Sequence, residues 1–350
     1  MQIASVTLTS NREDIIGDAL RSVVDFVDFC LIVDLGITDG TLDVAREVAG
    51  GKLRVVKLDE PEAFADARNF GMEEAHRLGA DWACSLDTDE RIHLNGVDIR
   101  KALDEIGSGV VLAPHDSGMY CKERFLKLPL VDRFSSKCHE CIVPQDAPQT
   151  FFDNICFSEL QKSGETLKKK LSEVVSHMNT QIEQEPYNPR WWYYLGDAQH
   201  GLGMVDEALH SFEKCAEMDG WDEESAWSCF RASTILGNKG ENRRALDLCL
   251  AGLVRHPGIA ELSWYAGEVC LGMGHPDKAI YWARMAAANG ITDGEEHFIR
   301  PRIGFRFPFG AKEGPHDLMV RAYTVMGMAK EAADAALVRD RISGVANACA

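Results

Sequence analysis

Along the first 115 residues, short apolar runs alternate with segments in which apolar residues recur at helical spacing. Four apolar runs predict β-strands over residues 2–9, 29–34, 53–58 and 82–87. The segments between and after them predict helices. The first carries the apolar residues from Ile15 to Val27 and could be capped by Ser10 or Asn11, and the others span residues 41–49, 63–78 and 97–106. Strands that alternate with helices form a mostly parallel sheet with both faces covered. We therefore expect an α/β domain whose ligands bind outside the carboxyl ends of its strands.

Residues 109–160 continue this domain with a less regular pattern. The run VVLAP predicts a strand over residues 110–114, and short strands are expected near 125–130 and 140–143. From Glu165 onward the spacing of apolar residues is helical. The pattern therefore predicts two domains, an α/β domain over residues 1–160 and an all-α domain over residues 161–350.

An internal repeat occupies about residues 186–290 of the helical part. Its clearest unit, NPRWWYYLGDAQHGLGMVDEALHSFEKCAEMD, has small and aromatic residues at the spacing typical of tetratricopeptide helix–turn–helix repeats. A second unit keeps Trp227, Gly237 and Ala245 but needs a couple of extra residues, and a third aligns Gly267 and Gly274. Neighbouring repeats of this type stack and bury a continuous core between them.

The end of the chain contains two further segments. Residues 318–343 are expected to form a final, capping pair of helices. Residues 291–316 break the helical pattern and are aromatic, basic and rich in Pro and Gly. The segment is either an ordered connection or a loop that folds back over the catalytic cleft. In the second case Arg300, Arg302 and Arg306 become available to a phosphate.

The formal net charge of −18, from 55 acidic against 37 basic residues, disfavours nucleic acid and anionic membranes as partners. The N-terminal segment lacks the pattern of a signal peptide, and no apolar run reaches the roughly 18 residues of a membrane span. We therefore expect a cytoplasmic protein whose 11 cysteines are reduced. The pair in CHEC, residues 138–141, lacks the second close pair that a structural zinc site normally has.

Polar residues cluster where the predicted strands end. Thr9 and Asn11 follow the first strand, Asp34 ends the second, Arg68 opens the helix after the third, and Asp87 follows the fourth. The carboxyl ends of parallel strands share one edge of a sheet, so these side chains are expected to form one site.

The sequence Asp87-Thr88-Asp89 suits a divalent cation. On extended backbone the two carboxylates would face the same way and could hold Mn²⁺ or Mg²⁺ through oxygen ligands. Such a cation offsets the negative charge that develops on a leaving diphosphate. A lone Asp-x-Asp is a weak signal, and its position directly after the apolar run WACSL makes it stronger.

Three motifs resemble those of family 2 glycosyltransferases, which have the GT-A fold, a Rossmann-like α/β architecture. They are VDLGITDGT at residues 33–41, FADARNFG at 64–71 and DWACSLDTDE at 81–90, and the match extends over about residues 1–143. The appended repeats resemble a subgroup in which such a domain carries tetratricopeptide repeats. That subgroup has an R-F … H-E pattern, which Arg124-Phe125 and His139-Glu140 match.

The resemblance implies roles for single residues on the donor side. Asp34 would contact the nucleoside, Asp39 would support the turn or the nucleoside, and Arg68 would line the nucleotide pocket. Asp87 and Asp89 would serve the metal and the sugar diphosphate. Two departures from the family pattern, Leu35 and Ile37, replace residues that are usually polar, which puts the identity of the donor base in doubt.

The resemblance also implies an inverting mechanism, in which a carboxylate deprotonates the acceptor. Glu140 and Asp116 are the candidates for this catalytic base. His139 is a candidate metal ligand or acceptor contact, and its alternative is a structural histidine.

Together these features predict a metal-dependent glycosyltransferase, of the hexosyltransferase type, that uses a nucleotide-sugar, with a UDP-sugar as first choice. The acceptor is expected to be a peptide, a protein, a glycan or another hydroxyl or thiol compound. The repeats would recruit it or mediate homo-oligomerisation. Two alternatives are a degenerate domain that acts as a protein-interaction scaffold and a nucleotidyltransferase, although the latter would need a Gly-rich phosphate loop that TLTSNRED lacks.

Overall fold

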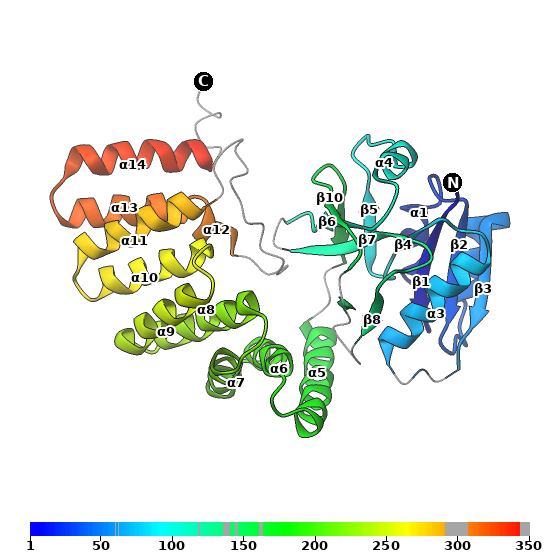
Figure 1. Ribbon diagram of the computed structural model, residues 1–350, viewed down its shortest axis with the longest axis horizontal. Helices are drawn as coiled ribbons and strands as arrows, with labels where there is room; N and C mark the ends of the chain where they lie inside the picture. Colours follow the sequence, from blue (N-terminus) through cyan, green and yellow to red (C-terminus); the bar gives the residue numbers. More distant parts are fainter. Residues whose placement is uncertain are drawn as a thin grey trace. The chain divides into compact units, whose positions relative to one another are not determined.

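The computed structural model describes residues 1–59, 61, 63–117, 120–135, 141–143, 146–160, 164–290 and 307–343. The chain divides into two compact units, Met1–Gln161 and Lys162–Ala350 (Figure 1). The first unit is an α/β structure and the second is all-helical.

A mixed, mostly parallel sheet forms the centre of the α/β unit. Among the described residues its seven strands lie in the order β10-β6-β7-β4-β1-β2-β3, and β7 alone runs antiparallel to its neighbours. The strands are β1 (Ile3–Thr9), β2 (Phe29–Asp34), β3 (Leu53–Lys57), β4 (Trp82–Ser85), β6 (Val110–Pro114), β7 (Cys121–Lys127) and β10 (Gln149–Phe151). Two short ribbons accompany the sheet, β5 (Glu90–His93) with β11 (Cys156–Glu159), and β8 (Arg133–Ser135) with β9 (Cys141–Val143).

Helices cover both faces of this sheet, because successive strand residues point to opposite sides. Ile3 and Ile32 belong to a core cluster with residues of α1 (Ile16–Arg21), α2 (Thr41–Ala49) and α4 (Ile99–Ile106). Val6 and Val33 belong to a second cluster with residues of α3 (Phe64–Arg77), which lies on the other face (Figure 1). The predicted α/β fold class is therefore confirmed.

The predicted start of the first helix is wrong. Helix α1 begins at Ile16 with Ile15 at its N-cap position, rather than after Ser10 or Asn11. The amide of Asn11 is bonded elsewhere, since its oxygen accepts from the backbone nitrogen of Thr38 at 2.7 Å. The short strands β5, β8, β10 and β11 were not predicted at all, because three or four residues are too few to display an alternating pattern.

The helical unit consists of successive hairpins that pack side by side (Figure 1). Its helices are α5 (Gly164–Gln184), α6 (Pro189–Gly201), α7 (Val205–Glu217), α8 (Asp222–Asn238), α9 (Asn242–Arg255), α10 (Ala260–Gly272), α11 (Pro276–Asn289), α12 (Pro308–Ala311), α13 (Gly314–Val325) and α14 (Ala329–Ile342). The α6–α7, α8–α9 and α10–α11 hairpins follow the predicted repeat, so the tetratricopeptide-like architecture is confirmed.

Each hairpin turns at a glycine in the left-handed region, with φ of 78° at Gly203, 78° at Gly240, 80° at Gly274 and 74° at Gly327. Gly237, which the second repeat unit shares with the pattern, lies inside α8 rather than at the turn. Helix α8 has 17 residues where α6 and α10 have 13, which explains the extra residues of that unit.

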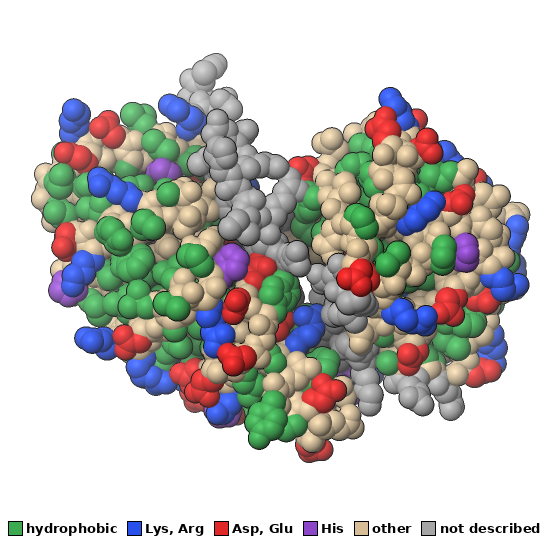
Figure 2. All heavy atoms as spheres, in the orientation of Figure 1, with side chains coloured by type: hydrophobic (Ala, Val, Ile, Leu, Met, Phe, Trp, Pro, Cys, Tyr) green, Lys and Arg blue, Asp and Glu red, His purple; other side chains and the backbone are tan. Residues whose placement is uncertain are grey.

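The surface of both units carries acidic and basic side chains intermixed (Figure 2). Hydrophobic side chains gather over α10 and α11 on one face of the helical unit (Figure 2), where Tyr281 and Met285 are exposed. Within the described ranges, no helix has the length and apolar character needed to cross a membrane.

Candidate active site

One edge of the sheet collects the ends of most parallel strands. Strands β4 and β6 are both antiparallel to β7, so their carboxyl ends lie at the same edge as those of β1 and β2. Thr9, Asp34, Asp87 and Asp116 end or follow these four strands. Strand β7 starts at this edge and brings Lys122 there.

The loop after β2 is held by side-chain bonds to its own backbone. The Asp34 carboxylate accepts from the backbone nitrogens of Gly36 at 2.8 Å and Ile37 at 2.7 Å. Leu35 and Ile37 are partly buried and pack against the two core clusters. The two apolar departures from the family pattern therefore anchor the loop on both faces of the sheet.

Asn11 and Asp39 complete this loop from outside. The Asn11 amide group donates to the Thr38 hydroxyl at 2.9 Å and accepts from the Thr38 backbone nitrogen. Asp39 accepts from the Thr41 hydroxyl at 2.5 Å, and this bond lowers the pKa of the Asp39 carboxyl. Thr9 is buried, and its hydroxyl donates to the backbone oxygen of Ser10 at 3.0 Å. Asn11 and Asp39 therefore shape the loop that follows β2.

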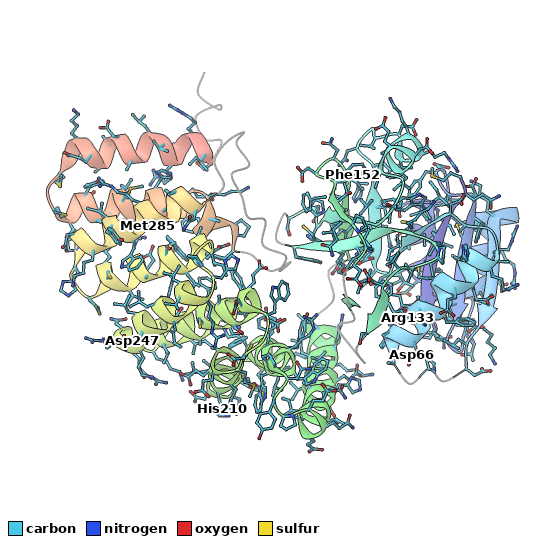
Figure 3. The ribbon with its side chains drawn as sticks, viewed as in Figure 1. Asp66, Arg133, Phe152, His210, Asp247 and Met285 are labelled. Carbon is cyan, nitrogen blue, oxygen red and sulfur yellow. The ribbon has the colours of Figure 1, made fainter. Side chains whose placement is uncertain are left out.

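The helix after β3 sends two adjacent side chains in different directions. Arg68 donates to the Ser85 hydroxyl at 3.0 Å and to the Asp87 carboxylate at 3.2 Å. Asn69 is buried and exchanges two hydrogen bonds with the backbone of Phe134, at 2.8 and 2.9 Å. In the Ala-Arg-Asn motif the arginine therefore faces the site, while the asparagine fixes β8. Asp66 precedes them near the start of α3, and Figure 3 labels it together with Arg133 of β8.

The carboxylate of Asp87 has a strongly shifted pKa. Burial opposes its ionisation, but the charges of Arg68, Lys122 and Arg124 outweigh burial and hold the pKa of Asp87 well below its usual range. The side chain retains 35% of its exposure. Asp87 is therefore an ionised carboxylate that a ligand can reach.

The backbone after β4 turns instead of staying extended. The nitrogen of Glu90 donates to the oxygen of Asp87 at 3.0 Å, which closes a turn over residues 87–90. The expectation of extended backbone at Asp87 and Asp89 is wrong, because a turn rather than a strand carries them. Both side chains remain partly exposed.

A buried ionic cluster beneath this turn was missed in the sequence. Glu90 is fully buried and accepts from Arg124 at 2.7 Å through both carboxylate oxygens, and from Lys122 at 2.7 Å. Lys122 also donates to Glu159 at 2.6 Å. Burial alone would lower the pKa of Lys122, but the Glu90 carboxylate raises it. The alternating charges of CKERFLK could have indicated that one face of this strand pairs with acids.

Of the two candidate bases, only Asp116 lies within the described residues. Its side chain is 52% exposed, and one carboxylate oxygen lies 3.0 Å from Nδ1 of His115. His115 stacks on Tyr120 at 4.8 Å between ring centroids. Glu140 and His139 lie outside the described residues, as do Arg300, Arg302 and Arg306.

The carboxylates at this edge could hold a hard divalent cation if substrate phosphates supply its other ligands. Among the described residues, no group of three His, Cys, Asp or Glu side chains is placed to hold a metal. Mg²⁺ and similar ions, however, are commonly held by one or two carboxylates together with substrate phosphates. An ionised Asp87 beside Asp89 satisfies that requirement, and so the residues present fit a cation that arrives with a diphosphate.

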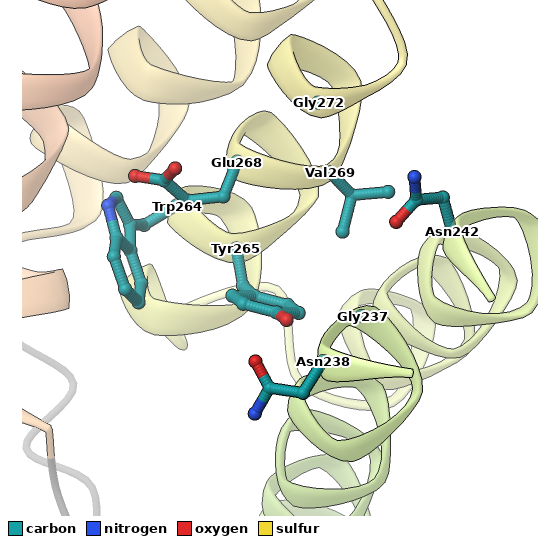
Figure 4. Close-up of a pocket in the computed structure, with 8 residues that line it drawn as sticks. All are labelled: Gly237, Asn238, Asn242, Trp264, Tyr265, Glu268, Val269 and Gly272. Carbon is teal, nitrogen blue, oxygen red and sulfur yellow. The ribbon is translucent and has the colours of Figure 1, made fainter. Parts of the chain in front are cut away.

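The helical unit contains a separate pocket of about 380 Å³ that residues of α8, α9 and α10 line (Figure 4). Amide, aromatic and carboxylate side chains line it. The lining residues are Gly237, Asn238, Asn242, Trp264, Tyr265, Glu268, Val269 and Gly272.

Residues 6–127 match the model of the glycosyl transferase family 2. The resemblance inferred from the three motifs is thereby confirmed over about a third of the chain, and it indicates glycosyltransferase activity in general. No curated protein matches the chain.

Solved structures similar to this chain include a crystal structure of MamA, with 17% identity and a TM-score of 0.41 over 54% of this chain and 98% of that one. A MamA structure from Desulfovibrio magneticus RS-1 has 16% identity and a TM-score of 0.39, over 52% of this chain and 94% of that one. YrrB, described as a TPR protein with an unusual peptide-binding site, has 14% identity and a TM-score of 0.38, over 50% and 78% respectively.

Proposed function

We propose that this protein is an inverting glycosyltransferase that moves a hexosyl group from a nucleotide-sugar to a hydroxyl or thiol of a peptide, protein or glycan. A UDP-sugar is the first donor to test. The observation that carries the proposal is the ionised Asp87, paired with Arg68 at the carboxyl edge of the sheet and within the stretch that matches family 2.

Different residues of this edge would bind the diphosphate and the nucleoside of the donor. Asp87 and Asp89 would hold Mn²⁺ or Mg²⁺ together with the donor diphosphate. When bound, the cation supplies Lewis-acid stabilisation of the departing nucleoside diphosphate. The nucleoside would contact the loop after β2 through Asp34 and Asp39, with Thr9 and Asn11 at the end of β1 as further candidate contacts.

Arg68 has a second role in this proposal. Its guanidinium already donates to Asp87, and it lies 5.6 Å from the centre of the Phe134 ring. A planar guanidinium keeps its charge at all working pH values and can orient a carboxylate or a phosphate oxygen. It would therefore fix the Asp87 rotamer and contribute to holding the nucleotide.

Asp116 is the candidate base among the described residues. It is exposed and follows β6 at the same edge as Asp87. In an inverting displacement it would accept the proton of the attacking hydroxyl or thiol. Glu140 remains the second candidate, and His139 remains a candidate metal ligand or acceptor contact.

The helical unit would bind the acceptor or a second copy of the chain. The pocket lined by α8, α9 and α10 offers the amides of Asn238 and Asn242 together with the Tyr265 ring. Such a mixture of amide and aromatic groups suits a peptide or a glycan, because both present hydrogen-bonding groups and apolar surface.

The decisive experiment measures hydrolysis of a panel of nucleotide-sugars with and without Mn²⁺, in wild type and Asp89→Asn. We expect the substitution to reduce the rate roughly 100-fold or more, since it removes a charge from the metal site. Asp43→Asn is the matched control, because Asp43 is 84% exposed and pairs with Arg46 on α2.

Three results would contradict the proposal in different ways. Wild type that binds no nucleotide-sugar, with or without Mn²⁺, would favour the scaffold alternative. Release of pyrophosphate from a nucleoside triphosphate and a sugar phosphate would favour a nucleotidyltransferase. Equal loss in Asp43→Asn would mean that the effect of Asp89→Asn is not specific to the site. Mass spectrometry of products formed in a lysate would then identify the acceptor.

A further inference from the structure

Glu90 follows the Asp-Thr-Asp motif directly and is fully buried. Its carboxylate accepts from the backbone nitrogen of Asp87 at 2.9 Å. The same oxygen, Oε2, accepts from Nη1 of Arg124 at 2.7 Å, while Oε1 accepts from Nη2 of Arg124 and from Lys122, both at 2.7 Å. One side chain thus joins the motif backbone to two cations of β7.

Arg124 fixes the other end of the same turn. Its Nη1 donates to the backbone oxygen of Ser85, the last residue of β4, at 2.8 Å. Its guanidinium carbon lies 4.1 Å from the centre of the Phe157 ring, so the group is held from the side as well. Arg124 thus bonds to Ser85 and to Glu90, the residues on either side of segment 86–89. The Arg124–Glu90 pair therefore restrains the turn at both ends.

A structural role alone does not explain why this position is ionic. Burying two charges carries a large desolvation cost, and apolar residues of similar volume often stabilise a core as well or better. Here the ionic groups donate to and accept from the backbone of the segment that bears Asp87 and Asp89. The cluster thus restrains this segment through directional bonds that an apolar substitute could not form.

Neutralising Glu90 would also change the electrostatics of the turn. The carboxylates of Asp87, Glu90 and Glu159 pair with the cations of Arg68, Lys122 and Arg124, and Arg91 is a further cation near Asp89. Without the charge of Glu90 these cations would be less compensated, and the turn would attract a divalent cation less strongly.

We propose that Glu90 is a positioning residue for the donor site: clamped by Arg124 and Lys122, it holds the Asp87–Asp89 turn in the conformation that binds a divalent cation with a nucleoside diphosphate. The inference rests on the proposed function, since it concerns the same metal and donor. It adds a residue that contacts neither, and acts through the backbone of Asp87.

The test is calorimetric titration of Mn²⁺ into the full-length protein with UDP, ADP, GDP, CDP or TDP present. Loss of a group that orients metal ligands typically weakens metal binding about 10- to 100-fold, and we expect this for Glu90→Gln. Glu74→Gln is the matched control, because Glu74 also pairs with an arginine, Arg77, but on the surface of α3. This control should bind Mn²⁺ like wild type.

Glu90→Asp separates position from charge. It keeps the negative charge but withdraws the carboxylate by one methylene from the Asp87 nitrogen, so a positioning role predicts weaker Mn²⁺ binding in this variant too. Amide hydrogen exchange in β4 and β5 verifies that each variant is folded, and Glu90→Asp carries the test if Glu90→Gln is not.

The outcomes are distinguishable. Wild-type affinity in a folded Glu90→Gln or Glu90→Asp overturns the positioning role and leaves the proposed function intact. If wild type binds no Mn²⁺ with any of the nucleotides, the proposed function and the positioning role both fail. Weakened binding in both Glu90 variants, with Glu74→Gln unchanged, supports the proposal.

Discussion

Each unit contains an arginine–carboxylate pair that joins distant parts of the chain, and these two pairs differ in burial. In the α/β unit, Arg124 and Glu90 retain 2% and 0% of their side-chain exposure. In the helical unit, Arg231 and Asp197 pair at 2.6 Å with 21% and 41% exposure. The second pair links α8 to α6, and the first links two strands beside the candidate site.

The difference shows that burial decides what an ion pair needs in order to form. Exposed pairs cost little to form and contribute little, because water and salt screen them. Buried pairs lose their hydration, so they persist only where good geometry and additional hydrogen bonds compensate for that loss. Glu90 and Arg124 have those additional bonds, to the backbone of Asp87 and Ser85.

The largest effect is expected for Arg124→Ala. It leaves Glu90 buried with Lys122 as its remaining cation and should destabilise the α/β unit by about 3–5 kcal/mol. Amide hydrogen exchange in β4 and β7 measures this unit by itself. Arg100→Ala, which breaks an exposed pair with Asp28 in the same unit, is the control and should cost about 1 kcal/mol or less. Equal losses of stability in Arg124→Ala and Arg100→Ala would contradict the expected difference between buried and exposed pairs.

Smaller losses of stability are expected at two glycines, one required by close packing in the α/β unit and one by backbone conformation in the helical unit. A Cβ on Gly71 would lie 2.8 Å from a methyl carbon of Val6, because α3 packs closely on the sheet. Gly71→Ala should therefore cost about 1–3 kcal/mol. Gly240 has no atom within 4 Å of its Cβ position but has φ of 78°. Gly240→Ala should cost about 1 kcal/mol, through backbone strain alone.

Urea denaturation of the full-length protein, monitored by amide hydrogen exchange in each unit, measures both glycine variants. A larger loss for Gly240→Ala than for Gly71→Ala would mean that the hairpin turn, rather than helix–sheet packing, limits local stability. Gly51→Ala, at a glycine with open space and no left-handed φ, is the neutral control.

The regular elements were predictable because each carries its own periodicity. The spans 29–34, 41–49 and 110–114 agree with β2, α2 and β6 at both ends. The turn over residues 87–90 was not predictable, because it depends on Glu90 reaching Arg124 and Lys122, which lie more than 30 residues away. The order of the motifs predicts that Asp87 and Arg68 share a site, and in the structure their side chains lie 3.2 Å apart.

The smallest effect is expected for Asp197→Asn, which makes the same carboxylate-to-amide change as Glu90→Gln in the other unit. Asp197 is 41% exposed, so its pair with Arg231 is partly screened, and Arg231 keeps its contact with the Phe212 ring at 5.0 Å. The loss should be about 1 kcal/mol or less, from urea denaturation monitored in α6 and α8. This loss of stability should become smaller at higher salt concentration, because salt screens the attraction between partly exposed charges. A loss as large as that of Arg124→Ala would mean that pairs between repeats determine the stability of the helical unit, and that burial does not separate the two kinds of pair.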